Sequence, residues 1–314
     1  MRRAAQVYGT MVTHTMIQYD AHKWLDHFFD IRGTLIRQIT PRVLGCVLWA
    51  AIVVAIHFHI RPVAVGVTVH SLVGVALGLL LVFRTNASYD RFWEGRKLWG
   101  GIVNETRNAA LMASVHLKDA PPLVWRFARW TALFPWMAIS TLRGTPVIGP
   151  AVAELPAADR RALESSQHPA LHSAHQMSLC LAEARERGFI SDYVQVAIDR
   201  NTQLLVDYLG GCERIRKTPL PFAYVVHLRR ALVLYCVTLP FALVDTFGWW
   251  TLLDVLLVAY TFLGIEEIGV EIEGPFGNDE NDLPLEALSE TIHQNVYSIA
   301  GIAAGKQEIM PEGL

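Results

Sequence analysis

The stretch that decides the fold is VAVGVTVHSLVGVALGLLLVF, residues 63–83, which contains no Asp, Glu, Lys or Arg. About 20 apolar residues in a helix span the hydrocarbon core of a bilayer, so this stretch is long enough to cross a membrane. It also contains Gly66, Gly74 and Gly78. Small residues at this density let helices approach closely or leave space for something to pass. We therefore expect a membrane helix with a role inside an assembly, and not a plain anchor.

A charged and aromatic segment follows directly, RTNASYDRFWEGRKLWG at residues 84–100. Arg and Trp residues of this kind gather where a membrane helix meets water. The composition agrees with a membrane protein, because 52% of the 314 residues are hydrophobic, only 18% are charged and the mean hydropathy is +0.30. The net charge of −2 gives no sign of a nucleic-acid partner. Four scattered cysteines without CxxC spacing indicate buried thiols.

The chain alternates between apolar segments and longer polar regions. The apolar segments are residues 43–58, 63–83, 231–247 and 249–265. Short loops join the first to the second and the third to the fourth, which predicts two transmembrane hairpins, 43–83 and 229–266. The other regions are 1–42, 84–228 and 267–314, where the last is rich in acidic residues. The middle region shows helical periodicity and no useful strand pattern. We expect an all-α fold in which four transmembrane helices continue into a cytosolic helical bundle.

The basic residues predict the orientation. Lys and Arg residues precede the first and third segments and follow the second, whereas the two short connecting loops contain only Arg61. By the positive-inside rule, both termini and the large middle region lie in the cytoplasm. The acidic C-terminal region, residues 267–314, then has the composition of a solvated cytosolic tail.

The sequence shows few features that would indicate an enzyme. It contains no HExxH motif, no GxSxG motif, no glycine-rich phosphate loop and no pair of carboxylates at a spacing typical of a catalytic site. His168, His172 and His175 form a helical ladder that suits zinc only if a carboxylate or Cys joins it. Asp254 lies in an apolar span, but close enough to Trp249 for its carboxylate to reach the membrane surface. We therefore expect no catalytic residues.

A transport function fits better. Four spans per chain are too few to enclose a water path, so a channel here requires an oligomer. In a symmetric ring one helix of each subunit faces the axis. Residues 63–83 form the best candidate, because Val75, Leu79 and Phe83 at i, i+4 and i+8 place three apolar rings on one helix face. A narrow apolar throat can gate ions by losing its water. On spacing alone, the same triplet could face lipid or a neighbouring helix.

Three segments resemble the signatures of the bestrophin family. They are residues 84–100 with Asn104, Arg107 and Asn108; TPLPFAY at 218–224; and PFGNDENDLPL at 275–285, in the bacterial form. The similarity covers about residues 30 to 295, and the chain is identified as a bacterial member. The resemblance implies a homopentameric ion channel with an all-helical fold in the bacterial inner membrane. It also implies that Val75, Leu79 and Phe83 form the pore neck.

The resemblance assigns two further sites. A second constriction at the cytosolic exit corresponds to Leu220, whose direction is fixed by Pro219 and Pro221. In animal bestrophins a dense acidic run binds calcium together with a backbone carbonyl of the N-terminus. Here the run is diluted to Asn278, Asp279, Glu280, Asn281 and Asp282. The remaining oxygen ligands suit a hard cation, but we expect structural packing of this loop before calcium sensing, and no certain cofactor.

The sign of the conducted ion is less constrained. The family as a whole implies chloride and other small anions, while some bacterial relatives pass cations. Apolar rings discriminate little by charge, so selectivity comes from charged groups near the pore mouths. Arg84 and Lys217 favour anions, whereas Glu213, Glu266 and Glu267 favour cations if they face the axis. We expect an anion channel, with a sodium-type channel of the same fold as one alternative. A non-conducting membrane scaffold or regulatory protein is the alternative of another class.

Overall fold

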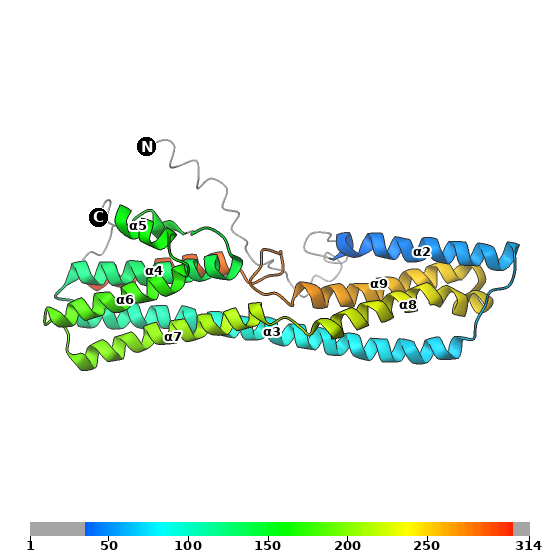
Figure 1. The fold of residues 1–314 in the computed structure, drawn as a ribbon, viewed down its shortest axis with the longest axis horizontal. Helices are drawn as coiled ribbons and strands as arrows, with labels where there is room; N and C mark the ends of the chain where they lie inside the picture. Colours follow the sequence, from blue (N-terminus) through cyan, green and yellow to red (C-terminus); the bar gives the residue numbers. More distant parts are fainter. Residues whose placement is uncertain (1–34, 148, 304–314) are drawn as a thin grey trace, which may run out of the picture.

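The computed structural model describes residues 35–147 and 149–303, which lie in helices and connecting loops. The molecule is elongated, with two helical lobes placed end to end (Figure 1). The membrane lobe contains α2 (Ile36–His59), the first half of α3 (Val67–His116), α8 (Phe222–Phe247) and α9 (Thr251–Glu271). The bundle lobe contains the second half of α3, α4 (Pro121–Arg143), α5 (Ala157–Glu164), α6 (Pro169–Glu186), α7 (Asp192–Lys217) and α10 (Leu285–Ala303). The prediction of an all-α fold is confirmed.

The membrane lobe holds three helical stretches that are long and apolar enough to cross a bilayer: Ile36–His59, Val67–His116 and Phe222–Glu271. The third stretch contains α8 and α9, which fold back on each other at the short 3₁₀ turn η2 (Gly248–Trp250). The helices of the first predicted hairpin are not neighbours, because α9 and α8 lie between α2 and α3 (Figure 1). The second hairpin therefore fills the space inside the first.

Helix α3 joins the two lobes. It runs for 50 residues, which corresponds to about 75 Å, and no proline interrupts it. In the membrane lobe its buried side chains Leu77 and Leu81 pack with Leu228 and Leu232 of α8. In the bundle lobe its Trp99 lies in the main hydrophobic core. This one helix therefore connects the membrane lobe directly to the bundle lobe.

The bundle lobe is built around α4. Side chains on all sides of this helix are buried, as expected for the central helix of a core. Pro121 and Pro122 begin the helix, where their missing N–H groups cost nothing, and Gly144 ends it in the left-handed region at φ 66°. Phe127 and Phe134 are fully buried, and each contributes about 1.5–3 kcal/mol of hydrophobic free energy.

Helix α10 corrects the prediction of a solvated acidic tail. Its side chains Ile292 and Val296 are fully buried in the bundle core against α3 and α4. Among the described residues, acidic side chains of this region lie on α9 and in the loop before α10, and Glu286 of α10 pairs with Arg143 of α4, so composition alone concealed an amphipathic helix. η1 (Pro150–Val152) and α5, which the periodicity also missed, cover the other side of this lobe.

Candidate ion pathway

The three predicted neck residues lie on a face of α3 that the rest of the chain leaves uncovered. Val75, Leu79 and Phe83 are 77%, 55% and 57% exposed, whereas Leu77 and Leu81 on the opposite face are buried. An apolar face of this kind in a single chain has its neighbours in lipid, in other subunits or at a pore axis. The position of the triplet is compatible with the predicted rings.

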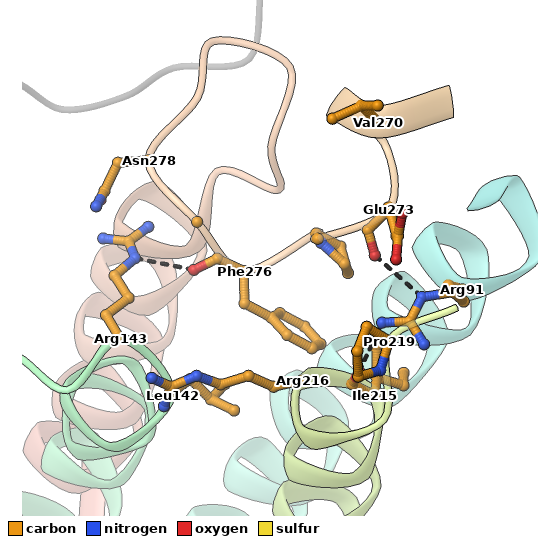
Figure 2. Close-up of a pocket in the computed structure, with 13 residues that line it drawn as sticks. Arg91, Leu142, Arg143, Ile215, Arg216, Pro219, Val270, Glu273, Phe276 and Asn278 are labelled. Atoms are coloured by element: carbon orange, nitrogen blue, oxygen red, sulfur yellow. Dashed lines mark hydrogen bonds between the residues drawn. The ribbon is translucent and has the colours of Figure 1, made fainter. Parts of the chain in front are cut away.

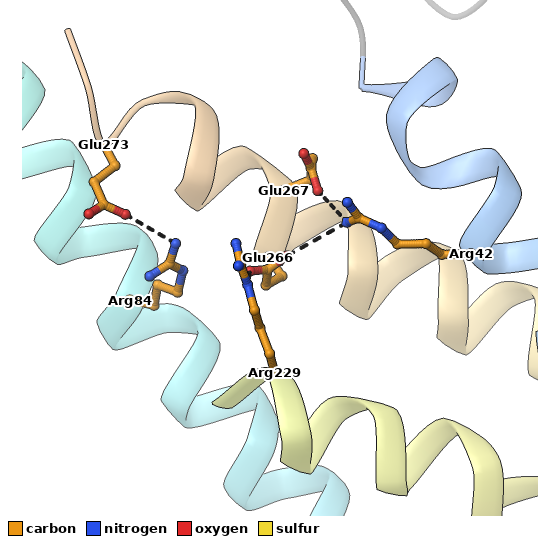
Figure 3. A network of polar contacts seen from close by, with 6 residues as sticks. All are labelled: Arg42, Arg84, Arg229, Glu266, Glu267 and Glu273. Carbon is orange, nitrogen blue, oxygen red and sulfur yellow. Dashed lines mark hydrogen bonds and ion pairs between the residues drawn. The ribbon is translucent and has the colours of Figure 1, made fainter. Parts of the chain in front are cut away.

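Arg84, the residue directly after Phe83, turns away from this face. Its side chain is 1% exposed, and its Nη2 donates to the carboxylate Oε2 of Glu273 at 3.2 Å (Figure 3). The other carboxylate oxygen of Glu273 accepts the backbone N–H of Leu220 at 3.0 Å. One carboxylate just after the end of α9 therefore connects α3, at Arg84, to the Pro-Leu-Pro segment.

Leu220 consequently lies at the junction of the two lobes. α3 continues for 32 residues beyond Arg84, so the far end of the bundle lobe is about 50 Å farther along the molecule. Arg91 holds the segment before Leu220, because its Nη1 donates to the carbonyl of Thr218 at 2.5 Å and its Nη2 to that of Ile215 at 2.7 Å. A narrowing at Leu220 would follow the neck closely.

The acidic residues nominated for selectivity at the junction are engaged in ion pairs. Arg229 Nε lies 2.8 Å from Glu266 Oε1, and Arg42 Nη1 lies 2.5 Å from Glu267 Oε2 (Figure 3). Glu266 is itself buried. These pairs join α2, α8 and α9 within the membrane lobe. Paired charges of this kind present little net field to a passing ion.

The two charged residues nominated at the end of α7 also neutralise each other. Lys217 Nζ lies 3.0 Å from Glu213, whose carboxylate also contacts His168 Nε2 at 2.8 Å. Burial on its own would raise the pKa of Glu213, but the hydrogen bonds with Lys217 and His168 hold it below its usual range. The second member of the histidine ladder, His172, packs edge-on against Trp130 instead of facing a ligand. In residues 35–147 and 149–303, no three His, Cys, Asp or Glu side chains gather as metal ligands.

The acidic loop folds inward. Asp282 is 5% exposed, and its Oδ2 accepts the backbone N–H of Asp279 at 2.7 Å. Burial raises the pKa of Asp282 to about 6. Asn281 donates to Glu271 at 2.9 Å. This arrangement does not fit a calcium ion held by the loop carboxylates, because Asp282 is directed into the loop itself; the predicted N-terminal carbonyl ligand lies outside the described residues.

A cavity of about 540 Å³ lies beneath this loop, between it and the end of α7 (Figure 2). Arg91 and Arg143 enter it from opposite sides, and their Nε atoms donate to the carbonyls of Glu273 and Phe276 at 3.1 Å and 3.0 Å. Arg143 also pairs with Glu286 of α10. The loop is thus fastened to α3, α4 and α10, which supports the predicted packing role.

Comparison with known proteins now identifies the family. Residues 16–298 match the model of the family described as Bacterial/Fungal Bestrophin protein. The chain belongs to this bestrophin family. It is 39% identical over 285 residues to the voltage-dependent anion channel-forming protein alr2987 of Nostoc, covering 89% of this chain and 92% of that protein. It is 32% identical over 306 residues to YneE of Escherichia coli K12, which carries the same description, covering 95% and 98%.

Solved structures of similar proteins have the same fold as this chain. A bacterial bestrophin homolog from Klebsiella pneumoniae superposes with a TM-score of 0.78 at 32% identity, covering 84% of this chain and 98% of that one. The predicted resemblance is confirmed, and the chain is a multi-pass, all-helical membrane protein of a channel-forming family. The sequence did not reveal the roles of Glu273, Arg91 and Arg143, because their partners lie between 53 and 189 residues away.

Proposed function

We propose that the chain forms a homopentameric channel that conducts chloride and other small anions passively across the bacterial inner membrane. The observation that carries the proposal is the uncovered apolar face of α3 at Val75, Leu79 and Phe83. In a five-fold ring this face becomes three stacked apolar rings, and such a throat opens or closes through its hydration. The description of the relatives as anion channel-forming proteins supports the choice of ion.

The proposed topology has four spans, formed by α2, the first half of α3, α8 and α9. The bundle lobe and both termini lie in the cytoplasm, since the basic residues cluster on that side. Leu220 supplies a second narrowing beneath the neck, and membrane lipid covers the outer faces of the spans. The loop at Asn278, Asp279, Glu280 and Asp282 acts in packing.

Purified protein reconstituted in a planar bilayer tests the proposal. Wild type should carry a current whose reversal potential under a salt gradient assigns an anion. Leu79→Ala and Phe83→Ala should each increase the single-channel conductance severalfold, because a wider and less apolar throat holds water more readily. Leu48→Ala is the matched control, since Leu48 is an exposed apolar residue of α2 outside the proposed neck. A mass measurement of the intact assembly counts the subunits.

Two results decide between the proposal and its alternatives. A reversal potential of the opposite sign assigns a sodium-type cation channel of the same fold. Absence of current in wild type and in both neck variants contradicts conduction and favours a membrane scaffold that binds a partner through the bundle lobe. Equal effects of Leu79→Ala and Leu48→Ala would show that the triplet faces lipid.

A further inference from the structure

The uncovered face of α3 does not end at the neck. With 100° per residue, the residues within about 40° of the line through Leu79 form one stripe along the helix. Every residue of this stripe from Val75 to Val115 is exposed, except Gly101, which is half-buried beneath the ring of Tyr208. In the membrane lobe α3 also lies along one edge of the molecule, and in the bundle lobe α7 runs beside it (Figure 1).

The chemistry of the stripe changes below Phe83. Its apolar part lies in the membrane lobe. In the bundle lobe most of its side chains are polar, although three are exposed and apolar: the polar ones are Asn86, Asp90, Lys97, Asn104 and Asn108, and the apolar ones are Trp93, Leu111 and Val115. A face that packs against other helices is usually apolar, whereas this one suits contact with water. The stripe therefore has the composition of an apolar throat followed by an aqueous passage.

Asp90 and Lys97 are the charged members of the stripe. Within the part of the chain that the structure describes, neither forms an ion pair, in contrast to Arg84, Glu266 and Lys217. The absence of a partner leaves the field of each charge available to ions nearby. These two residues, and not the charges that the sequence nominated, are in a position to act on a permeating ion.

The geometry of α3 relates both residues to the neck. Lys97 lies 18 residues after Leu79, which is five full turns, so it has the same direction about 27 Å farther along. Asp90 lies within about 20° of that direction and about 10 Å beyond Phe83. Because α3 is uninterrupted by proline, a neck that faces the axis implies that Lys97 and Asp90 face it too.

We propose that the exposed stripe of α3 lines the pathway from the neck into the bundle lobe, and that Lys97 and Asp90 set its ion selectivity. The inference rests on the proposed channel function. In a pentamer, Lys97 forms a ring of five positive charges that concentrates anions. Asp90, nearer the neck, forms an opposing ring. The balance between the two rings determines the permeability ratio of anions to cations.

The expected effect is measurable. Five charges about 10 Å from an axis, screened by salt, change the local concentration of a monovalent ion roughly threefold. The effect on the anion-to-cation ratio is roughly tenfold, because the two ions respond in opposite directions. Lys97→Gln should lower this ratio by about that factor at low salt, and Lys97→Glu should lower it further. Asp90→Asn should raise it.

Reversal potentials under a salt gradient, at low and high ionic strength, provide the test. Arg96→Gln is the matched control. This substitution also removes one positive charge at nearly the same position along α3, but Arg96 points about 100° away from Lys97. Lys97 is exposed and Arg96 is half-buried, and a mass measurement of each intact variant checks that it assembles as wild type does. The shift for Lys97→Gln should shrink at high salt, while Arg96→Gln should leave the ratio unchanged.

The outcomes separate the inference from the proposed function. Wild-type current with no shift in either Lys97 variant, or with equal shifts for Lys97→Gln and Arg96→Gln, overturns the inference and leaves the channel intact. Absence of wild-type current overturns both. A selective shift at Lys97 with an opposite one at Asp90→Asn supports the assignment.

Discussion

The ion pair between Arg84 and Glu273 should be a main contributor to the stability of the junction between the lobes. Arg84 is 1% exposed and Glu273 is 19% exposed, and their closest atoms are 3.2 Å apart. Among the described residues, Glu273 is the only hydrogen-bond acceptor of the Arg84 guanidinium, whose Nε and Nη1 have none. Glu273→Gln therefore leaves a buried positive charge uncompensated while keeping an oxygen for the N–H of Leu220.

The magnitude follows from the geometry. Two unit charges at this separation attract by about 5 kcal/mol at an effective dielectric constant of about 20. The partial exposure of Glu273 and the hydrogen bonds that Gln retains reduce the loss to about 3 kcal/mol, the lower end of values for a broken buried pair. For a protein of this size such a loss lowers the unfolding midpoint by about 5–10 °C.

Thermal unfolding of the purified protein in detergent, at one fixed scan rate, measures this shift. The control is Glu94→Gln, which breaks a pair with Arg214 in which both side chains are exposed, Glu94 by 43% and Arg214 by 67%. Exposed pairs contribute under about 1 kcal/mol, so this variant should shift the midpoint little. Equal shifts for the two variants would refute the reasoning. A double variant, Arg84→Met with Glu273→Gln, would also refute it if its loss of stability equalled the sum of the losses in the two single variants, because the residues would then act independently.

Two further predictions concern the loop regions. Asp282→Asn should stabilise the protein above pH 6 by roughly 3 kcal/mol. The folded pKa is raised to about 6 from 3.8, so the unfolded state ionises first and wild-type stability falls as pH rises through that window. Unfolding midpoints of both proteins at about pH 4 and pH 8 check it, and a gap independent of pH would contradict it. Gly149→Ala should lower the midpoint, because Gly149 has φ 125° and an added Cβ would lie 2.7 Å from Cγ of Trp136. The cost is about 1–3 kcal/mol from strain, and the matched Gly210→Ala, which has open space, should not show it.

Local signals in the sequence predicted much of the fold. Hydropathy and helical periodicity located the apolar segments and most of the bundle helices, although α2 begins seven residues and α8 nine residues before the predicted segments. These starts were missed because the first nine residues of the two helices contain Arg37, Arg42, Arg229 and Arg230, which a hydropathy window excludes. The polar residues extend the same helices to the membrane surface.

In the candidate site, too, local sequence signals predicted some features and could not predict others. Spacing on one helix sufficed to place Val75, Leu79 and Phe83 on a common face, because their relation depends on 3.6 residues per turn and on nothing distant. The sequence left open which of the charges near the proposed constrictions face an ion, for the opposite reason. Whether Arg84 or Glu266 faces an ion depends on partners about 190 and 40 residues away, and sequence distance carries no information about such pairs.

The sequence by itself thus determined the helical class, the apolar spans, the neck face and the family signatures. Only the tertiary structure decided that α9 and α8 lie between α2 and α3, that α10 belongs to the core, and that Glu273 links Arg84 to Leu220. Among the described residues, it also decided which charges of α3 form no ion pair. The physical reason is that hydropathy and helix periodicity are properties of neighbouring residues, whereas burial and ion pairing arise only when distant segments meet.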